Sequence, residues 1–362
     1  MVFGAEQVNL IHPENSNDHF KQFFMMNRFF IYKIFQWSFI SFLLPIELRA
    51  QAVQPKLDSP AQNILLADPS VLLYKNFYYL YGTASPADEG FPVFRSSDLM
   101  TWTGPAGAKN GFAIKKGDSY GSKGFWAPQA FAYRNKFYMA YTANEHIAIA
   151  TSDKPEGPFK QNNLRCLDSN TRQIDPCIFI DDDGKKYLYY VRVANGGNRI
   201  FVAELNEDLL SVKKQTEKLC IEATDPWETA DSNFSRWTVT EGPSVIKHNH
   251  VYYLIYSAND FRSPYYAVGY ATSQSPLGPW KKSDENPMIR TEITGQNGSG
   301  HGDLVKGKNG AWFYVFHTHY SANQVQPRKT ALMELRFVAD PQSDFDKLIV
   351  QPGTFHYLFY NH

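Results

Sequence analysis

Three carboxylates in this chain stand beside turns, and each precedes a strand-like run of aromatic residues. Asp68 and Asp175 are followed directly by proline, and Glu241 is followed by a Gly-Pro pair. Proline and glycine mark turns, and runs rich in tyrosine and phenylalanine are typical of strands. A general acid and a general base are what hydrolysis requires, provided that one fold brings these turns together.

The same layout occurs five times along the chain. Trp126 and His301 mark the two remaining copies, and the aromatic runs begin 9 to 11 residues after each marked residue, at positions 77, 137, 186, 251 and 312. Three carboxylates, a tryptophan and a histidine therefore occupy one equivalent position in five repeats. The runs alternate between large residues, which is typical of a half-buried strand.

The repeats predict an all-β fold, a five-bladed β-propeller in a single domain. After about residue 60 the chain consists of units of roughly fifty to sixty-five residues, each with two strand patterns, and no segment has a helical period. A two-sheet sandwich would not explain that period. In a propeller the equivalent positions of all blades meet near the axis. Converging carboxylates raise one another's pKa, which indicates a chemical use.

With these motifs in their order, the chain resembles the family 43 glycoside hydrolases from about residue 63 to residue 335. In Ala-Asp-Pro-Ser-Val, Asp68 matches that family's general base. In Ile-Asp-Pro, Asp175 matches the carboxylate that positions the acid and tunes its pKa. In Glu-Gly-Pro, Glu241 matches the general acid. Each motif alone would equally suit an ordinary turn residue.

The resemblance also implies residues that contact the substrate or an ion. Trp126 resembles the sugar-facing tryptophan, and Phe125 precedes it in the stretch 116–126, which we expect to close one end of the pocket. His301 resembles an axial histidine near a bound calcium or other ion, and Arg328 an arginine near the tuning aspartate. A core role for the tryptophan, a metal-free buried histidine and a surface arginine are the alternatives. No other cofactor is expected.

The resemblance implies an inverting mechanism in which Glu241 protonates the leaving group and Asp68 activates water. We expect an exo-acting α-L-arabinofuranosidase. A β-xylosidase or a β-galactofuranosidase or galactan-active hydrolase is the alternative within the family. A non-catalytic carbohydrate-binding propeller would not need Glu241. A five-bladed β-fructosidase is disfavoured because its Trp-x-Asn-Asp-Pro-Asn opening is absent.

The first fifty residues suggest an exported protein. Residues 1–24 resemble an upstream extension that is not part of the true chain. Residues 25–52 have the basic start, the apolar middle and the small-residue end of a signal peptide, with a buried N-terminal helix as the alternative. A linker at 53–62, the propeller at 63–340 and a C-terminal tail at 341–362 follow. We expect a periplasmic or secreted protein without a membrane span.

The composition limits the classes of partner that the protein is expected to bind. The 36 basic and 36 acidic residues balance, and no basic block favours nucleic acid. Aromatic residues make up 15% of the chain, which suits both strands and sugar-stacking surfaces. We expect an oligosaccharide or polysaccharide partner and a monomer. Cys166, Cys177 and Cys220 lack metal-ligand spacing, and they leave one disulfide or three buried thiols as options.

Overall fold

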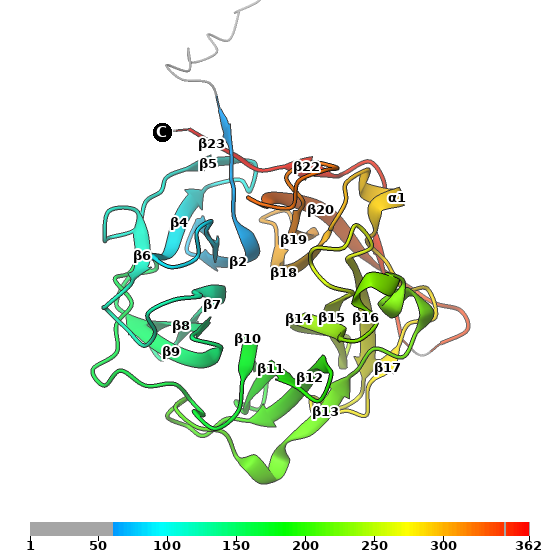
Figure 1. Ribbon diagram of the computed structural model, residues 1–362, viewed down its shortest axis with the longest axis horizontal. Helices are drawn as coiled ribbons and strands as arrows, with labels where there is room; N and C mark the ends of the chain where they lie inside the picture. Colours follow the sequence, from blue (N-terminus) through cyan, green and yellow to red (C-terminus); the bar gives the residue numbers. More distant parts are fainter. Residues whose placement is uncertain (1–60, 344, 362) are drawn as a thin grey trace, which may run out of the picture. The chain divides into compact units, whose positions relative to one another are not determined.

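The computed structural model describes residues 61–343 and 345–361, and strands supply nearly all of their regular structure. These strands form five successive groups around one axis (Figure 1). The predicted five-bladed β-propeller is therefore confirmed. The upstream extension, the signal peptide and most of the linker lie outside the described residues. No helix among the described residues is long and apolar enough to cross a membrane.

Each blade is an antiparallel meander that starts at the axis and runs outward. The innermost strands are β2 (Ala67–Tyr74), β7 (Trp126–Tyr133), β10 (Gln173–Ile180), β14 (Thr238–His248) and β18 (Gly300–Lys306). The second strands are β3 (Phe77–Thr83), β8 (Lys136–Ala143), β11 (Lys186–Ala194), β15 (Val251–Ala258) and β19 (Trp312–Thr318). The third strands are β4 (Gly90–Ser96), β9 (His146–Ser152), β12 (Gly197–Glu204), β16 (Ala267–Ser273) and β20 (Lys329–Val338).

Shorter elements complete the rim of the propeller. The outer strands are β5 (Thr101–Thr103), β13 (Lys218–Ile221), β17 (Lys281–Lys282) and β21 (Lys347–Val350), while β6 (Phe112–Lys115) pairs with β4 and β22 (His356–Tyr357) with β20. The helical pieces are α1 (Thr291–Thr294) and the 3-10 turns η1 (Lys214–Thr216), η2 (Pro226–Thr229) and η3 (Ser232–Phe234). Blades 3 and 4 are joined directly, because β12 and β14 pair in parallel.

The two ends of the described chain close the ring in blade 1. Strand β23 (Phe359–Asn361) lies between β1 (Gln62–Asn63) and β5, antiparallel to the first and parallel to the second (Figure 1). The end of the predicted linker is thus already a strand. The predicted C-terminal tail pairs with blade 5 through β21 and with blade 1 through β23.

The apolar core is divided among the interfaces between neighbouring blades. Five clusters of buried residues each join two adjacent blades. In β3, Tyr78 and Leu80 pack toward blade 5, while Tyr79 and Tyr81 pack toward blade 2. Both faces of such strands are buried, so the prediction of half-buried strands was wrong. Alternate large side chains of these strands therefore point into two different buried cores, and not alternately into a core and into solvent.

A β-bulge interrupts the start of every innermost strand. Asp68, Ala127, Asp175, Gly242 and His301 occupy these bulges with φ values between 42° and 60°. These five residues are the equivalent positions of the blades. The predicted equivalence was therefore one residue off in blades 2 and 4, where Trp126 and Glu241 precede the left-handed residue. The residue before the proline, or before Gly302 in blade 5, marks the true register.

Candidate active site

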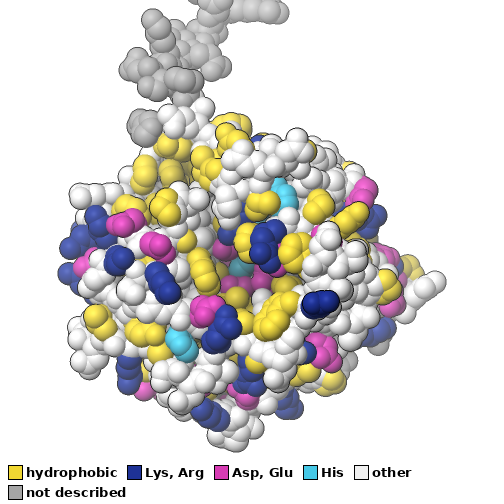
Figure 2. Space-filling view, in the orientation of Figure 1, with side chains coloured by type: hydrophobic (Ala, Val, Ile, Leu, Met, Phe, Trp, Pro, Cys, Tyr) yellow, Lys and Arg dark blue, Asp and Glu magenta, His cyan; other side chains and the backbone are white. Residues whose placement is uncertain are grey.

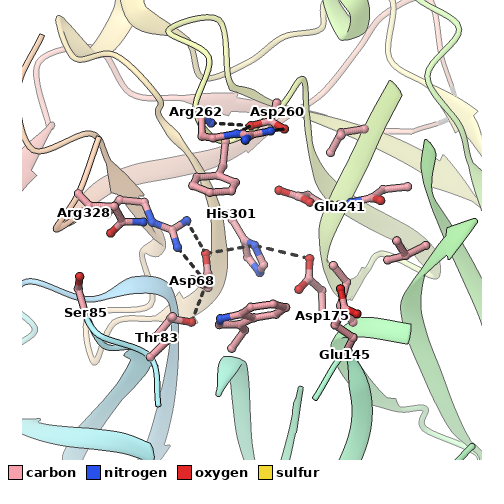
Figure 3. A pocket seen from close by; sticks show the side chains of 18 of the residues that line it. Asp68, Thr83, Ser85, Glu145, Asp175, Glu241, Asp260, Arg262, His301 and Arg328 are labelled. Carbon is pink, nitrogen blue, oxygen red and sulfur yellow. Dashed lines mark hydrogen bonds and ion pairs between the residues drawn. The ribbon is translucent and has the colours of Figure 1, made fainter. Parts of the chain in front are cut away.

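A pocket of about 540 Å³ opens at the axis, on the side where the five bulges converge. Figure 2 shows the hollow with acidic side chains at its floor and basic ones around it. Asp68, Asp175 and Glu241 line it, and so do Trp126, His301 and Arg328. All six come from different turns of the chain, and Figure 3 shows the carboxylates facing the same space.

Asp68 is held by donors on both carboxylate oxygens. Thr83 donates to Oδ2 over 2.6 Å, and Arg328 donates from Nη1 to Oδ1 over 3.0 Å. Burial alone raises the pKa of Asp68, but Arg328, His301, His317 and the Thr83 hydroxyl outweigh burial. They hold the pKa well below the usual range of an aspartate, so this carboxylate stays ionised.

Arg328 differs from the expectation that it lies by the tuning aspartate. Its guanidinium binds Asp68 instead, and its Nη1 lies 3.1 Å from His317 Nε2. The side chain is buried, and the ring of Phe261 lies 4.8 Å from its Cζ. The arginine directly precedes β20, the third strand of blade 5, and closure of the ring brings it beside Asp68 of blade 1.

Asp175 and Glu241 are buried carboxyl groups whose pKa values both rise. Burial is the largest cause in each case, and the negative charges of Glu241 and Asp68 raise the pKa of Asp175 further. The pKa of Glu241 rises to about 7, although hydrogen bonds from Tyr266 and Asn198 oppose the rise. Because neighbouring carboxylates resist double ionisation, this pair retains a proton near neutral pH.

Each oxygen of Glu241 has one side-chain donor. Tyr266 donates its hydroxyl to Oε1 over 2.9 Å, and Asn198 donates its amide to Oε2 over 3.2 Å. Tyr266 is fully buried and precedes β16, and Asn198 lies in β12. Elements of blades 3 and 4 therefore fix the carboxyl group of Glu241 from both sides.

The preceding blade stabilises each bulge by accepting the N–H of the left-handed residue. Thr83 accepts from Ala127, Thr142 from Asp175, Ser257 from His301, and His317 from Asp68. These acceptors all lie at or near the ends of second strands. In blade 3 the strand end has no hydroxyl, and the N–H of Gly242 donates to Asp175 Oδ2 over 3.2 Å instead. This exception ties Asp175 to the turn that carries Glu241.

His301 lies between the two aspartates, as Figure 3 shows. Its Nδ1 is 3.4 Å from Asp68 Oδ1 and 3.8 Å from Asp175 Oδ2. Burial lowers the pKa of His301 against the opposing effect of Asp68, so the imidazole is neutral near pH 7. The ring packs on Gly242, where an added Cβ would lie only 2.7 Å from His301 Cγ.

Phe125 does not face the pocket, so its predicted role in substrate binding was wrong. The side chain is fully buried and packs with Phe91 and Tyr141 between blades 1 and 2. Of the stretch 116–126, Trp126 alone lines the pocket. Gly124 donates its N–H to Asp88 Oδ1, and the residues of the stretch before Trp126 lie outside the pocket, so the stretch does not form the expected rim.

Residues 57–342 match the model of the glycosyl hydrolases family 43. The chain belongs to this family. It is 27% identical over 312 residues to a β-D-galactofuranosidase of Aspergillus niger, covering 78% of this chain and 85% of the relative. It is 25% identical to an extracellular endo-α-(1→5)-L-arabinanase of Bacillus subtilis, covering 70% of this chain and 76% of that one.

Solved structures agree with that assignment. An endo-1,4-β-xylanase from Bacteroides thetaiotaomicron superimposes with a TM-score of 0.76 at 41% identity, over 84% of this chain and 100% of the other. A thermostable family 43 glycoside hydrolase superimposes with a TM-score of 0.70 at 37% identity, over 80% of this chain and 93% of the other. This family 43 protein is therefore a glycosidase that hydrolyses glycosidic bonds, whereas the named substrates belong to the relatives.

The axial ion implied for this family 43 chain is not supported by its side chains alone. No three His, Cys, Asp or Glu side chains are grouped as metal ligands in residues 61–343 and 345–361. Below the aspartates, a cavity of about 20 Å³ lined by His301, Gln129 and Asp303 has room for about one water. Calcium prefers six to eight oxygen ligands.

Several residues in and around the pocket of this glycosidase were not predicted. Thr83 and Tyr266 donate to the carboxyl groups, and His317 accepts the backbone N–H of Asp68. Asn198, Trp237 and the loop Asp260–Arg262 form a wall. The hydroxyl residues at the ends of second strands form a repeat that could have been found. The wall comes from loops of unequal length, for which the repeats offer no template. The three cysteines are free thiols, and only Cys177 is buried.

Proposed function

We propose that this family 43 protein is an inverting, exo-acting glycosidase that removes terminal α-L-arabinofuranosyl residues from plant polysaccharides. One observation carries the proposal. Two buried carboxyl groups of one pocket have pKa values displaced in opposite directions, that of Asp68 downward and that of Glu241 to about 7. A base that is always ionised and an acid that keeps its proton near neutral pH are what glycoside hydrolysis needs.

In this mechanism Asp68 is the general base. Its carboxylate takes a proton from a water molecule, whose oxygen forms a bond to the anomeric carbon on the face opposite the leaving group. Arg328 and Thr83 hold the carboxylate in place. They also lower the basicity of Asp68. The carboxylate therefore takes a proton from the water only as the glycosidic bond breaks and the water becomes more acidic.

Glu241 is the general acid and gives its proton to the departing glycosidic oxygen. Asp175 supports it in two ways. Two negative charges, one on Asp175 and one on Glu241, are unfavourable in this buried site, so the pair of carboxyl groups keeps a proton. Asp175 Oδ2 also accepts the N–H of Gly242, which fixes the backbone next to the acid.

The glycone is proposed from chemistry and from relatives together. A pocket of about 540 Å³ with its reacting groups at the floor suits one terminal sugar better than the middle of a chain. The β-D-galactofuranosidase relative supports a furanose, because α-L-arabinofuranose and β-D-galactofuranose share the same ring configuration. β-D-Galactofuranose is therefore an alternative glycone for the same pocket.

A second candidate is hydrolysis of β-xylosidic bonds. The structure with 41% identity is described as an endo-1,4-β-xylanase, and this likeness is closer than that to the galactofuranosidase. A pyranose ring would then occupy the floor beside Trp126. The same acid and base would act, so the two candidates differ in the glycone alone.

The test is a parallel assay with 4-nitrophenyl α-L-arabinofuranoside, β-D-xylopyranoside and β-D-galactofuranoside, followed by proton NMR of the first sugar released. We expect the arabinofuranoside to be the fastest and the product to appear first as the β-anomer. Faster cleavage of the xyloside would show that the glycone is β-D-xylopyranose rather than α-L-arabinofuranose. Release of the α-anomer from the arabinofuranoside, or of the β-anomer from either β-glycoside, would overturn the inverting mechanism. Binding of arabino-oligosaccharides without cleavage would make the chain a binding propeller.

A further inference from the structure

A chain of three polar groups links the wall of the pocket to Glu241. The indole of Trp237 donates from Nε1 to Asn198 Oδ1 over 3.0 Å, and Asn198 donates from Nδ2 to Glu241 Oε2 over 3.2 Å. Asn198 is buried, while Trp237 is 39% exposed and lines the pocket. The exposed end of this relay is therefore open to ligand, and its buried end is the proposed acid.

The indole determines which way the amide of Asn198 points. An indole N–H can only donate, so the amide oxygen must face Trp237 and the amide nitrogen must face Glu241. An amide N–H₂ cannot accept, so Glu241 cannot direct its acidic proton at Asn198. The proton of Glu241 is thereby kept for the pocket. If the oxygen of Asn198 faced Glu241, it would accept that proton and withdraw it from the leaving group.

The backbone holds both ends of the relay in register. Blades 3 and 4 are joined at this point, where Asn198 of β12 pairs with Val239 of β14. Thr240 Oγ1 also donates to the carbonyl of Asn198 over 3.2 Å. Trp237, Asn198 and Glu241 thus lie on strands or strand ends that pair with each other. The position of the Trp237 indole therefore affects Glu241 through a single side chain, that of Asn198, rather than through a loop.

We propose that Trp237 is the platform for the leaving-group sugar and that Asn198 is a positioning residue that couples this platform to Glu241. The inference rests on the proposed function. A general acid lies beside the oxygen that departs, so an exposed aromatic face one amide away from Glu241 lies on the leaving-group side. Aromatic faces stack on the apolar faces of sugar rings. A sugar stacked on Trp237 would then hold the indole in place and, through Asn198, would also hold the carboxyl group of Glu241 in place.

The test compares Trp237→Phe and Asn198→Ala with wild type on two substrates that carry the glycone accepted in the parallel assay. One is a disaccharide, whose departing oxygen needs a proton, and the other is a 2,4-dinitrophenyl glycoside, whose leaving group does not. Trp312→Phe is the matched control, because Trp312 is a half-buried tryptophan of β19 that does not line the pocket.

We expect both variants to lose about tenfold or more in kcat on the disaccharide and far less on the dinitrophenyl glycoside. Loss of a donor to the carboxylate raises the pKa of Glu241, so the basic limb of the pH profile should move upward by about 0.5 to 1 unit. Trp237→Phe keeps an aromatic face, so KM for the disaccharide should change less than kcat. The control should match wild type throughout.

Equal losses on both substrates, or an unmoved basic limb, would overturn the relay and leave the proposed function intact. Absence of glycoside cleavage by the wild-type enzyme would instead overturn the proposed function. The relay is then decided by carbon-13 NMR titration of the Glu241 carboxyl group in wild type and Asn198→Ala. A higher pKa in the variant supports the hydrogen-bonded coupling, and identical titration contradicts it.

Discussion

At the scale of residues, three carboxyl groups of one pocket acquire different proton affinities from their neighbours. All three are buried, and burial alone would raise the pKa of each. Only Asp68 has a guanidinium, a hydroxyl and two imidazoles around it, and these reverse the direction. Asp175 and Glu241 lie near each other's charge and have mainly neutral donors. The different neighbours therefore separate a proposed base from a proposed acid.

These directions predict the pH dependence of activity. Glu241 must be protonated, so kcat/KM should fall as pH rises through about 7. Asp68 must be ionised, and because its pKa is depressed, activity should persist well below the ordinary range of an aspartate. Measurement of kcat/KM from about pH 3 to about pH 9 checks both limbs. Activity that stays constant through neutrality would contradict the assignment of Glu241.

At the scale of elements, five bulges place the reacting side chains. Each bulge has a left-handed residue, and only Gly242 among the five lacks a side chain. The reason is contact rather than backbone alone, because the ring of His301 occupies the space of a Cβ at this position. Glycine therefore lets His301 and the Glu241 turn pack at the axis.

Gly242→Ala should lose activity by more than tenfold and destabilise the protein by about 2 kcal/mol or more, from backbone strain plus the clash. Gly184→Ala is the matched control, because Gly184 has a φ of 82° but has no atom within 4 Å of an added Cβ. It should cost about 1 kcal/mol from strain alone and leave kcat unchanged. Urea unfolding and kcat measure both. Equal effects in the two variants would contradict a role for the His301 contact.

The repeat pattern predicted these elements well but located the sites less accurately. Proline and aromatic runs indicated five blades and the three carboxylates. The marked residue was misplaced in blades 2 and 4 because the functional side chains there precede the bulge residue. Phe125 was misassigned because an aromatic residue next to a turn suits core and rim alike. The wall around Asp260 depends on long-range contacts, such as the bond between His319 Nε2 and the carbonyl of Phe261.

At the scale of the whole molecule, closure of the ring supports the base. Arg328 lies in blade 5, directly before β20, whereas Asp68 lies at the start of blade 1, and the two meet where the ring closes. Strand β23, near the end of the chain, pairs with β5 of blade 1. Leu358 is fully buried between these blades, and its backbone pairs with Ile64 and Thr330. The tail thus contributes apolar contacts at the closing interface. Sequence repeats indicate such an interface but not the residues that form it.

Leu358→Ala should therefore destabilise the protein by about 2 to 5 kcal/mol, as large-to-small changes in a core do. Phe359→Ala is the control, because Phe359 is 41% exposed and one residue away. It should cost much less and leave activity unchanged. Thermal unfolding of the two variants gives the comparison. A similar loss of Tm in both would show that the strand pairing of β23, rather than the buried leucine, holds the ring.

The most direct test of the account is the behaviour of Glu241→Gln and Asp68→Asn on leaving groups of different basicity. We expect Glu241→Gln to lose roughly 10² to 10⁴ in kcat on a disaccharide, and much less on the 2,4-dinitrophenyl glycoside, which departs without a proton. Asp68→Asn should lose activity on both, because the water still needs its base. Equal losses in Glu241→Gln on both substrates, or full activity in either variant, would contradict the assignment of acid and base.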